Sequence, residues 1–513
     1  MVGAECREGE VCSSLELISL STTDNEIWPG RVNIDVTAAL RNRSSHKIEH
    51  AAIKLTFIDS SGARDVDFVA RQNVPWSGSI KAGHRVEIPF TVDVSPLASI
   101  EREIIVNGEL LFIDGGVSYV LNATKPIRLY FAAINSDLTV NTTIDSDDGS
   151  NNTEGTDSLS LRKALRIANE RPGIDRITFS QDIFITGQRN LITLDSNLPD
   201  LPPLHGDIEP TLLIADNNRV TITPDSGYDN SRRVGISVYG PAVVSGIEFL
   251  EMSRLIESSA QCPDEGPEPG VGSAILIAGG ENAAITNNNF DDTGLLVRPC
   301  IHHLIAVTAG ENHVLANNFF NSPAGSVIGI FSSPVEVRGN RIINGLNNGV
   351  VIDAPGNIVK FTGNLLVNMS AVGLGIFDNN DVEATHNTFV RTQCNSIIAL
   401  APARLWLRNN VYIDSEYTAL SSHNNGLNIN AAYEATDIAV YCQNCLEATI
   451  DSSSMIISVD AGLANSLGSS WEELMPTVNS VLIDSGLDVI DRNGSEVGRF
   501  SGYASDRGAI ERP

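Results

Sequence analysis

Short apolar runs alternate with polar turns through residues 274–412, and the pattern repeats every 22 to 29 residues. Three runs per repeat, such as Val327–Phe331, Val335–Val337 and Arg341–Ile343, predict three strands in each unit. No apolar period of 3.6 residues indicates helices here, and a repeat of this length is typical of a solenoid. The pattern therefore predicts a parallel β-helix with three strands and three turns per coil.

Two columns run through these repeats. Asparagine recurs in equivalent positions, with an apolar residue two positions later: Asn288, Asn317, Asn340, Asn364, Asn387 and Asn409, then Phe290, Phe319, Ile342, Leu366, Phe389 and Val411. Because coils stack about 4.8 Å apart, each side chain lies on its own copy in the next coil. Asparagine amides both donate and accept, so we expect a hydrogen-bonded ladder inside one turn. The apolar column is expected to be core, and none of these asparagines is expected to be catalytic.

Residues 14–131 follow a different pattern, with period-two strands at Val32–Leu40, Ile48–Ile58, Arg85–Val94 and Val117–Leu129. Several short strands between turn signals predict an immunoglobulin-like β-sandwich. It is similar to the accessory sandwich domains of bacterial surface proteins, and residues 1–13 are expected to be a tail. We thus expect an all-β chain.

Residues 132–157 are polar and acidic, which predicts a linker or a calcium loop through Asp145, Asp147 and Asp148. The EF-hand pattern fails, because Gly149 stands where a ligand is required. Calcium is the one cofactor that this stretch suggests. A single amphipathic helix follows at Leu159–Glu170, which Asp157 or Ser158 is expected to cap and which Pro172 ends.

Three segments around this helix resemble a known family: Val140–Asp145, Ser160–Asn169 and Pro172–Phe179 are similar to the start of bacterial β-helix proteins with a CSLREA-type motif, although Lys163 stands where Glu is usual. The closing segments Val481–Gly486, Asp491–Gly494 and Asp506–Glu511 resemble the same family. The resemblance implies a right-handed, pectin-lyase-like β-helix. It also implies that residues 158–180 cap its first coil, that residues 181–430 form the coils, and that residues 431–513 close it. Members are mostly uncharacterised surface and secreted proteins, including adhesin-like ones.

Composition and charge narrow the range of possible binding partners. The chain has 513 residues, and 34 Lys+Arg against 63 Asp+Glu give a net charge of −29. Such a surface repels nucleic acid and anionic membranes, and no apolar run approaches the roughly 20 residues of a membrane span. We expect neither nucleic acid nor membrane insertion among its partners.

Cysteine usage favours an oxidising, extracytoplasmic compartment. We expect disulfides Cys6–Cys12, Cys262–Cys300 and Cys442–Cys445, with Cys394 left over, because no spacing matches a zinc site. The first residues lack a charged n-region and an apolar h-region, so we expect a mature chain whose signal peptide has been removed. The protein is expected to be secreted or on the cell surface.

The resemblance extends to pectate lyases and polygalacturonases, whose active groups project from the sheet before the strand that leads into the asparagine turn. Here that face offers one carboxylate, Asp353, flanked by Phe331 and Phe377 on small residues. A hydrolase needs two carboxylates, so this face argues against catalysis. Aromatic rings with a carboxylate predict a glycan-binding platform instead, unless another segment or a partner covers the two rings.

The next sheet places Glu336, Lys360 and Glu383 on consecutive coils, with Arg338 beside them and His313 on an earlier coil. One interpretation is a surface ladder of alternating charge, in which each pair stabilises by about 0–1 kcal/mol. The other is a catalytic site for an acidic sugar with His313 as proton shuttle.

Two irregular insertions interrupt the early coils at 258–272 and 291–303. The second gathers candidate ligand-binding residues: Asp291, Asp292, Arg298 and His302, with His303 next to them.

Two functions therefore remain. The first is an adhesin-like binding protein that presents its β-helix to a polysaccharide, a surface glycan or another cell-surface protein. The second is a lyase or hydrolase that acts on an acidic polysaccharide.

Overall fold

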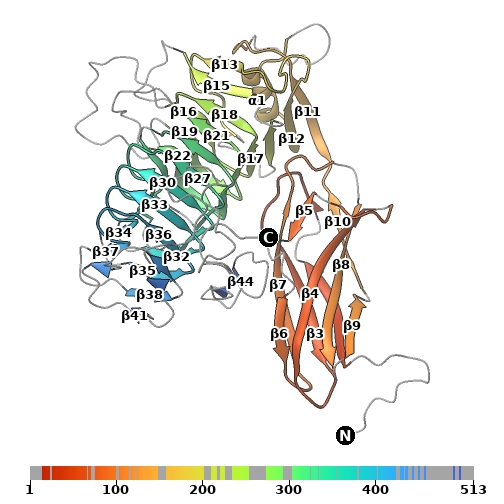
Figure 1. Cartoon of the computed structure of the whole chain (residues 1–513). Coiled ribbons are helices and arrows are strands. Elements are labelled where there is room, and N and C mark those ends of the chain that lie inside the picture. The colour runs from red at the N-terminus through yellow and green to blue at the C-terminus, as the bar shows by residue number, and fades with distance from the viewer. Residues whose placement is uncertain are drawn as a thin grey trace. The chain divides into compact units, whose positions relative to one another are not determined.

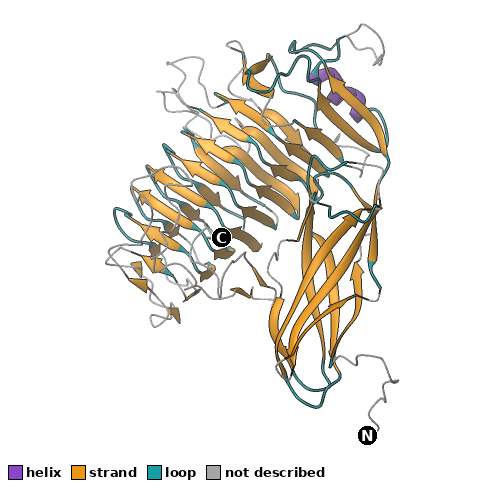
Figure 2. Cartoon of the chain, turned by 45° about the vertical axis from the view of Figure 1, so that its right-hand side comes forward, coloured by secondary structure: helices purple, strands orange, loops and turns teal. Residues whose placement is uncertain are grey.

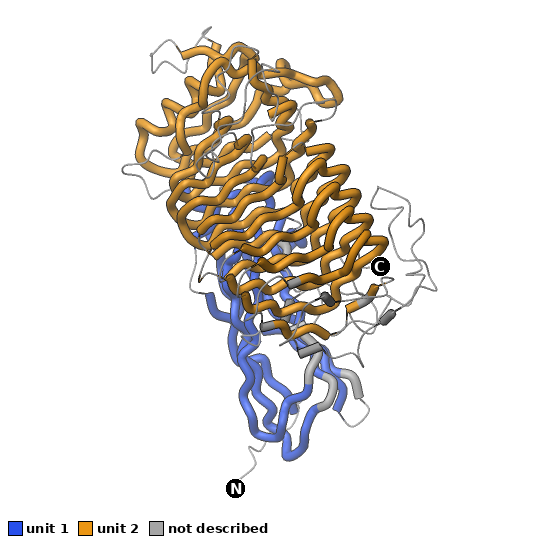
Figure 3. The backbone as a smooth tube through the Cα atoms, turned by 90° about the vertical axis from the view of Figure 1, so that its left-hand side faces the viewer, with its two compact units in different colours: residues 1–133 blue, residues 134–513 orange. Residues whose placement is uncertain are grey.

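The computed structural model divides the chain into two compact units, residues 1–133 and 134–513, which are described separately (Figure 3). The described residues are 14–22, 26–59, 61–65, 67–70, 76–99, 103–114, 117–123, 125–147, 158–201, 210–215, 220–225, 234–252, 273–292, 303–323, 325–332, 334–354, 356, 358–377, 380–400, 403–422, 428–432, 434–436, 442–443, 449–450, 456–457, 489–490 and 496–497. Among them, no helix is long and apolar enough to span a bilayer.

The first unit is a β-sandwich of two mainly antiparallel sheets, ordered β1-β3-β7-β5 and β2-β10-β8-β4-β6, with β9 also on β8 (Figure 1). Its strands are β1 Leu15–Thr22, β2 Glu26–Ile27, β3 Ile34–Asn42, β4 Ile48–Asp59, β5 Phe68–Ala70, β6 Trp76–Ile80, β7 Arg85–Val94, β8 Glu103–Asp114, β9 Val117–Asn122 and β10 Ile127–Phe131. The period-two pattern buries one face of each sheet, as in β8, where every second residue from Ile104 to Phe112 is buried. The predicted strand Val117–Leu129 covers both β9 and most of β10, which are separate strands in the structure.

The second unit is a stack of coils with three long parallel sheets, called here sheets I, II and III (Figure 2). Sheet I contains β11 Ile134–Val140, β12 Ile174–Phe179, β14 Thr211–Ile214, β17 Ala242–Ser245, β20 Ala284–Thr286, β23 His313–Ala316, β26 Val335–Arg338, β29 Ile358–Thr362, β32 Asp381–Thr385, β35 Arg404–Arg408, β38 Asn428–Ala432 and β41 Thr449–Ile450. Sheet II contains β13 Asn190–Leu194, β15 Val220–Pro224, β18 Ile247–Leu250, β21 Asn289–Asp291, β24 Phe319–Asn321, β27 Arg341–Ile343, β30 Leu365–Met369, β33 Thr388–Thr392, β36 Val411–Ile413, β39 Ala435–Thr436 and β42 Ile456–Ile457. Sheet III contains β16 Val234–Val238, β19 Ser273–Glu281, β22 His303–Glu311, β25 Ser326–Ile330, β28 Val350–Ile352, β31 Leu374–Ile376, β34 Ile397–Ala399, β37 Leu420–Ser422 and β40 Cys442–Gln443. A further antiparallel pair joins β43 Val489–Ile490 to β44 Glu496–Val497.

Two boundaries differ from the sequence prediction. β11 lies in the stretch 132–157 that was expected to be a linker, because Leu138 and Val140 point into the core and pair the strand with β12. Coils also continue past residue 430, since β38 to β42 extend all three sheets as far as Ile457.

The asparagine ladder exists, but its register corrects two of the six predicted members. The ladder runs through Asn288, Asn318, Asn340, Asn364, Asn387 and Asn410, so Asn317 and Asn409 are wrong by one residue. Each amide nitrogen donates to the next coil's side-chain oxygen at 2.9–3.1 Å and to a backbone carbonyl of the preceding coil. The same oxygen accepts the backbone N–H of its neighbour.

The apolar column shifts with the ladder. Phe290, Phe320, Ile342, Leu366, Phe389 and Tyr412 are paired on consecutive coils, which replaces Phe319 and Val411. All are essentially buried. Ring stacks add to this core, with centroids 4.6 Å apart for Phe290–Phe320 and 5.4 Å for Phe389–Tyr412.

The backbone conformation of the residue before each ladder asparagine explains the one-residue error in the predicted register. Asn287, Asn317, Gly339, Gly363, His386 and Asn409 all have φ between 55° and 64°. This left-handed conformation favours Gly, Asn and, less often, His. The turn thus uses two residues, a left-handed one followed by the ladder asparagine, and the Asn-Asn doublets contain both.

The α1 helix, Leu161–Asn169, lies against β11 and β12 at the start of the coil stack. Its N-cap is Ser160, whose hydroxyl accepts the Lys163 backbone N–H at 3.1 Å, rather than Asp157 or Ser158. Leu161 and Leu165 are fully buried in the core of the first coils. The expected capping helix is therefore present and covers apolar side chains.

A carboxyl group ends the described part of the ladder. Glu434 is fully buried, and its oxygens accept the Asn410 backbone N–H at 3.2 Å, the Asn410 amide and the Tyr412 hydroxyl at 2.6 Å. Burial raises the pKa of Glu434 to about 7, although these hydrogen bonds and Arg408 oppose the shift.

The ladder should be a main source of stability in the second unit. Asn364→Ala removes the acceptor for two Asn340 N–H groups and the donor to the Val337 carbonyl. Buried groups without partners cost about 1–3 kcal/mol each, so we expect a loss of about 2–4 kcal/mol in urea unfolding followed by circular dichroism. Asn347→Ala, at an exposed turn, is the control and should change stability by less than about 0.5 kcal/mol.

Glu434→Gln should alter how stability depends on pH. The folded-state pKa of about 7 exceeds the ordinary 4.5, so the wild type loses stability as the pH rises from 4.5 to 7. The glutamine variant lacks this loss, and the difference should reach the order of 3 kcal/mol. Urea unfolding across this pH range measures it, with Glu416→Gln at an exposed position as control. Parallel pH profiles for wild type and Glu434→Gln would contradict the assignment.

Candidate functional site

Sheet III carries the flattest outward face of the β-helix. The residues that point outward along its centre are paired strand to strand and are small or apolar: Ser237, Leu276, Ala306, Gly329, Val351, Gly375 and Ile398. The neighbouring Ala399 points inward and is fully buried.

Phe331, Asp353 and Phe377 occupy one edge of this face, each directly after its strand. Their backbone N–H groups donate to Val307, Ile330 and Ile352 on the preceding coils at 2.7–2.8 Å. The three residues are therefore equivalent positions on consecutive coils, and each is half-buried. With strands about 4.8 Å apart, the two phenylalanines are separated by about 10 Å with Asp353 between them.

The rings lie across the sheet because glycines leave room for them. A methyl group in place of the Gly329 hydrogen would lie 2.5 Å from the ring of His303, which meets Phe331 edge-on with centroids 5.0 Å apart. Gly375 is covered in the same way by the Phe377 ring, 3.2 Å from the corresponding position. His303 is 6% exposed and belongs to this platform, a role that the sequence did not indicate.

The charged column on sheet I is real for three of its predicted members. Glu336, Lys360 and Glu383 are paired on consecutive strands, and Arg338 lies 3.4 Å from Glu336. The corrected register adds Trp406 to this column next to Glu383.

Arg408 comes with Trp406, since its guanidinium lies 4.0 Å from the centre of the Trp406 ring. Leu405 and Leu407, which alternate with them along β35, point inward and are buried. Glu383 and Arg408 are 3% and 8% exposed, whereas Glu336, Arg338 and Lys360 are partly exposed.

His313 does not belong to the charged column. It pairs with Val335, while Val314 is the residue in register with Glu336. Its Nδ1 accepts the Ala283 N–H at 3.2 Å and its Nε2 lies 3.1 Å from the Ala309 carbonyl. Burial lowers the pKa of His313 to about 4. The proposed proton shuttle is therefore wrong, and this histidine holds a turn between coils.

Asp291 and Asp292 lie on sheet II rather than beside the phenylalanines. The Asp291 carboxylate is 3.8 Å from Arg189, which also binds Glu248 at 2.9 Å. Asp292 is 2% exposed. Arg298 and His302, the other candidates of this insertion, lie outside the described residues.

The candidate calcium carboxylates bind arginines of α1. Asp145 accepts two hydrogen bonds from Arg162, at 2.9 and 2.6 Å, and Asp147 accepts one from Arg166 at 2.6 Å. These ion pairs attach the acidic segment to the capping helix and occupy the oxygens that a cation needs. Asp148 lies outside the described residues, among which no group of three or more His, Cys, Asp or Glu side chains is placed to hold a metal.

Cys394 is a free, half-buried thiol. The expected disulfides involve Cys6, Cys12, Cys262, Cys300 and Cys445, which lie outside the described residues, and Cys442, whose side chain is not described.

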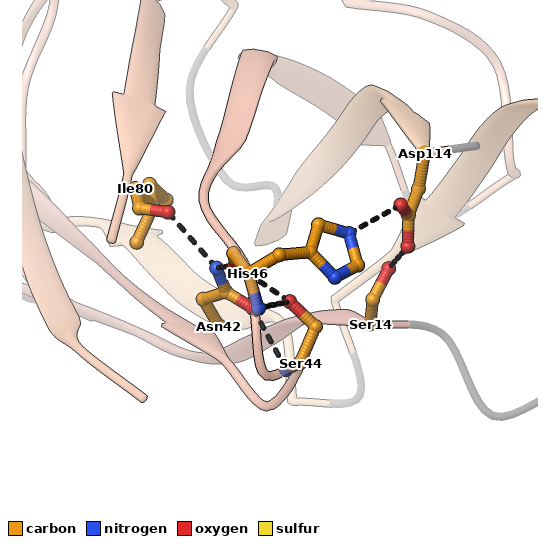
Figure 4. Close-up of polar contacts among 6 residues, drawn as sticks. All are labelled: Ser14, Asn42, Ser44, His46, Ile80 and Asp114. Carbon is orange, nitrogen blue, oxygen red and sulfur yellow. Dashed lines mark hydrogen bonds and ion pairs between the residues drawn. The ribbon is translucent and has the colours of Figure 1, made fainter. Parts of the chain in front are cut away.

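One Ser–Asp–His cluster occurs in the first unit (Figure 4). Asp114 lies at its centre, accepting from the Ser14 hydroxyl and contacting His46 Nε2 at 2.7 Å. In a hydrolase the histidine must contact the serine to activate it. Here the aspartate lies between the serine and the histidine, so the serine is not activated as a nucleophile. Beside it, the buried Asn42 amide donates to the His46 and Ile80 carbonyls and closes the β3–β4 connection.

The glycine beneath the ring pair offers a test of the platform's geometry. Gly329→Ala should displace His303 and Phe331, because its methyl group has no room, and overpacking of this kind costs about 1–3 kcal/mol. Gly279→Ala is the matched control on the same sheet, since its nearest neighbouring atom is 3.6 Å away. Thermal unfolding of the two variants measures the difference, and equal stabilities would contradict the packing.

Comparison with known proteins concerns the fold. The family model described as right handed beta helix region matches residues 268–412, and the curated proteins give no match. Similar solved structures, each 12% identical, include the FixG-related protein from Vibrio parahaemolyticus (24% of this chain, 99% of that chain, TM-score 0.18), the periplasmic chaperone SfaE (24% and 66%, TM-score 0.16) and the ASH/PapD-like domain of human CEP192 (26% and 96%, TM-score 0.16). The family match and the stacked parallel sheets together show that the second unit contains a right-handed parallel β-helix.

Proposed function

We propose that this chain is a secreted or cell-surface, adhesin-like binding protein whose β-helix presents sheet III to a glycan. The observation that carries the proposal is the platform of Phe331, Asp353 and Phe377 on consecutive coils, in which the Phe377 ring covers Gly375 and the Phe331 ring packs edge-on against His303. Aromatic faces stack on the apolar faces of sugar rings, and a carboxylate accepts hydrogen bonds from their hydroxyls.

The spacing of the platform also suits a sugar chain. One strand spacing of about 4.8 Å is close to the length that each sugar residue adds to an extended pyranose chain. Two rings separated by about two spacings can therefore stack on alternate sugars, while Asp353 contacts the sugar between them.

The edge that carries the two rings has one carboxyl group between them, Asp353, where a glycosidase needs two. Among its described positions, Asp200 and Asp353 are the carboxyl groups nearest the two ends of the edge. Asp200 precedes the bridge from Leu201 to β16, and Asp353 follows β28. About five strand spacings, about 24 Å, separate them, whereas a glycosidase pair is about 5–10 Å apart. Glu281 and Glu311 are paired with each other on β19 and β22, but they lie three residues beyond Ala278 and Thr308, the positions of the edge on those strands. Binding without cleavage is the function that this geometry supports best.

Phe331→Ala/Phe377→Ala should abolish retention on the polysaccharide that the wild type binds. Each lost stacking contact is worth about 1 kcal/mol or more, so we expect affinity to fall by at least tenfold. The assay is affinity electrophoresis against a panel of neutral and acidic polysaccharides, with and without calcium.

Tyr417→Ala removes a 60%-exposed aromatic from a turn outside the platform and should bind as the wild type does. New reducing ends or unsaturated products would favour an enzyme instead. Undiminished retention by the double variant would place the glycan elsewhere.

A further inference from the structure

The aromatic edge of sheet III begins before Phe331. Tyr239 directly follows β16, and its N–H donates to Leu201 at 2.8 Å, which is the same pattern that places Phe331 after β25. Its ring packs on the neighbouring strand, with Cδ1 3.8 Å from the position of a methyl group on Gly279. Tyr239 thus contacts Gly279 on the neighbouring strand, whereas Phe377 covers Gly375 on its own strand.

Nothing large stands between Tyr239 and Phe331 on this edge among the described residues. The intervening positions are Ala278 and Thr308, and the face beside them is Leu276 and Ala306. Three strand spacings separate Tyr239 from Phe331 and two more lead to Phe377, which gives a length of about 24 Å. This length corresponds to roughly six sugars at one sugar per strand.

Asp200 lies beside Tyr239 at the end of the face. Leu201 bridges Val238 in parallel, so Asp200 is in register with Ser237, the first outward residue of the centre. Burial raises the pKa of Asp200, and a hydrogen bond with Ser237 opposes this shift. Burial and the Asp200 charge also raise the pKa of Tyr239, which keeps its hydroxyl protonated as a donor at neutral pH.

Charge limits which sugars fit. The strands of sheet III contain no Lys or Arg, while Glu281 and Glu311 are exposed on β19 and β22. Asp200 and Asp353 add carboxyl groups at two further positions along the face. A uronic acid chain would meet like charges throughout, and nothing on these strands would pair with its carboxylates.

We propose that sheet III binds an uncharged, unbranched glycan chain that lies parallel to the helix axis and spans about five strand spacings from Tyr239 to Phe377. This inference rests on the proposed function. It adds a third aromatic contact, and it specifies the direction in which the glycan chain lies, the length of chain that is bound and the absence of charge on its sugars. Tyr239 acts as a binding residue at the far end, with its ring stacked on a sugar and its hydroxyl available to one.

The test is a titration with cello-oligosaccharides and N-acetylated chito-oligosaccharides from dimer to octamer, followed by calorimetry. We expect affinity to rise up to about the hexamer, where the chain fills the edge, and then to level off. Tyr239→Ala should lower hexamer affinity about tenfold, the equivalent of one stacking contact. It should leave trimer affinity unchanged, because a trimer fills only the Phe331–Phe377 segment.

Three controls keep the outcome interpretable. Tyr239→Phe retains the ring and should bind the hexamer nearly as the wild type does, and Tyr417→Ala should have no effect at any length. Oligogalacturonates of the same lengths should bind more weakly than the neutral series.

Each opposite result has a separate meaning. A plateau at the trimer, a Tyr239→Ala effect that is equal for trimer and hexamer, or a preference for oligogalacturonate overturns this inference and leaves the Phe331–Phe377 platform intact. Absence of binding at every length overturns the proposed function together with it.

Discussion

The second unit depends on one constraint, which is that backbone groups in a buried turn must find partners. Each coil turns sharply between sheets I and II, and the turn leaves N–H and carbonyl groups away from water. The asparagine ladder satisfies them with a side chain that has both a donor and an acceptor. Because every rung bonds to the coil before and the coil after, the ladder also fixes the register in which coils stack. The flat face of sheet III, with its aromatic residues in equivalent positions of the coils, exists only in that register.

The first unit obeys a simpler rule. Alternate residues of its strands fill a single core between two sheets, and its polar contacts serve to close turns, as Asn42 does between β3 and β4. Its architecture could be predicted from the period-two alternation of apolar and polar residues, although this alternation did not separate β9 from β10. Nothing in its described polar clusters has the geometry of a catalytic site.

Most of the β-helix could be predicted from the sequence, because few folds are compatible with a repeat of polar and apolar columns at this period. The column itself could not be assigned where two asparagines are adjacent. At Asn317-Asn318 and Asn409-Asn410, one asparagine takes the left-handed backbone and the other the ladder, and only backbone conformation separates them. A slip of one residue turns a strand's side chains to its other face. That slip placed His313 on the surface and hid Trp406 and Arg408. Tyr239 was missed for another reason, since the first coils are too irregular to align with the later ones.

The end of the ladder affects how such a protein can change its length. An asparagine side chain can continue the ladder, because its oxygen accepts a hydrogen bond from one coil and its nitrogen donates one to the next. Glu434, when ionised, offers acceptors to Asn410 and Tyr412 and has no donor to hand on. Duplication of a coil between Asn288 and Asn410 would insert one more self-compatible rung, whereas duplication beyond Glu434 would begin with a side chain unable to continue the series. In its ionised form this carboxyl group thus ends the described series of side-chain hydrogen bonds, while the coils themselves continue through β41 and β42.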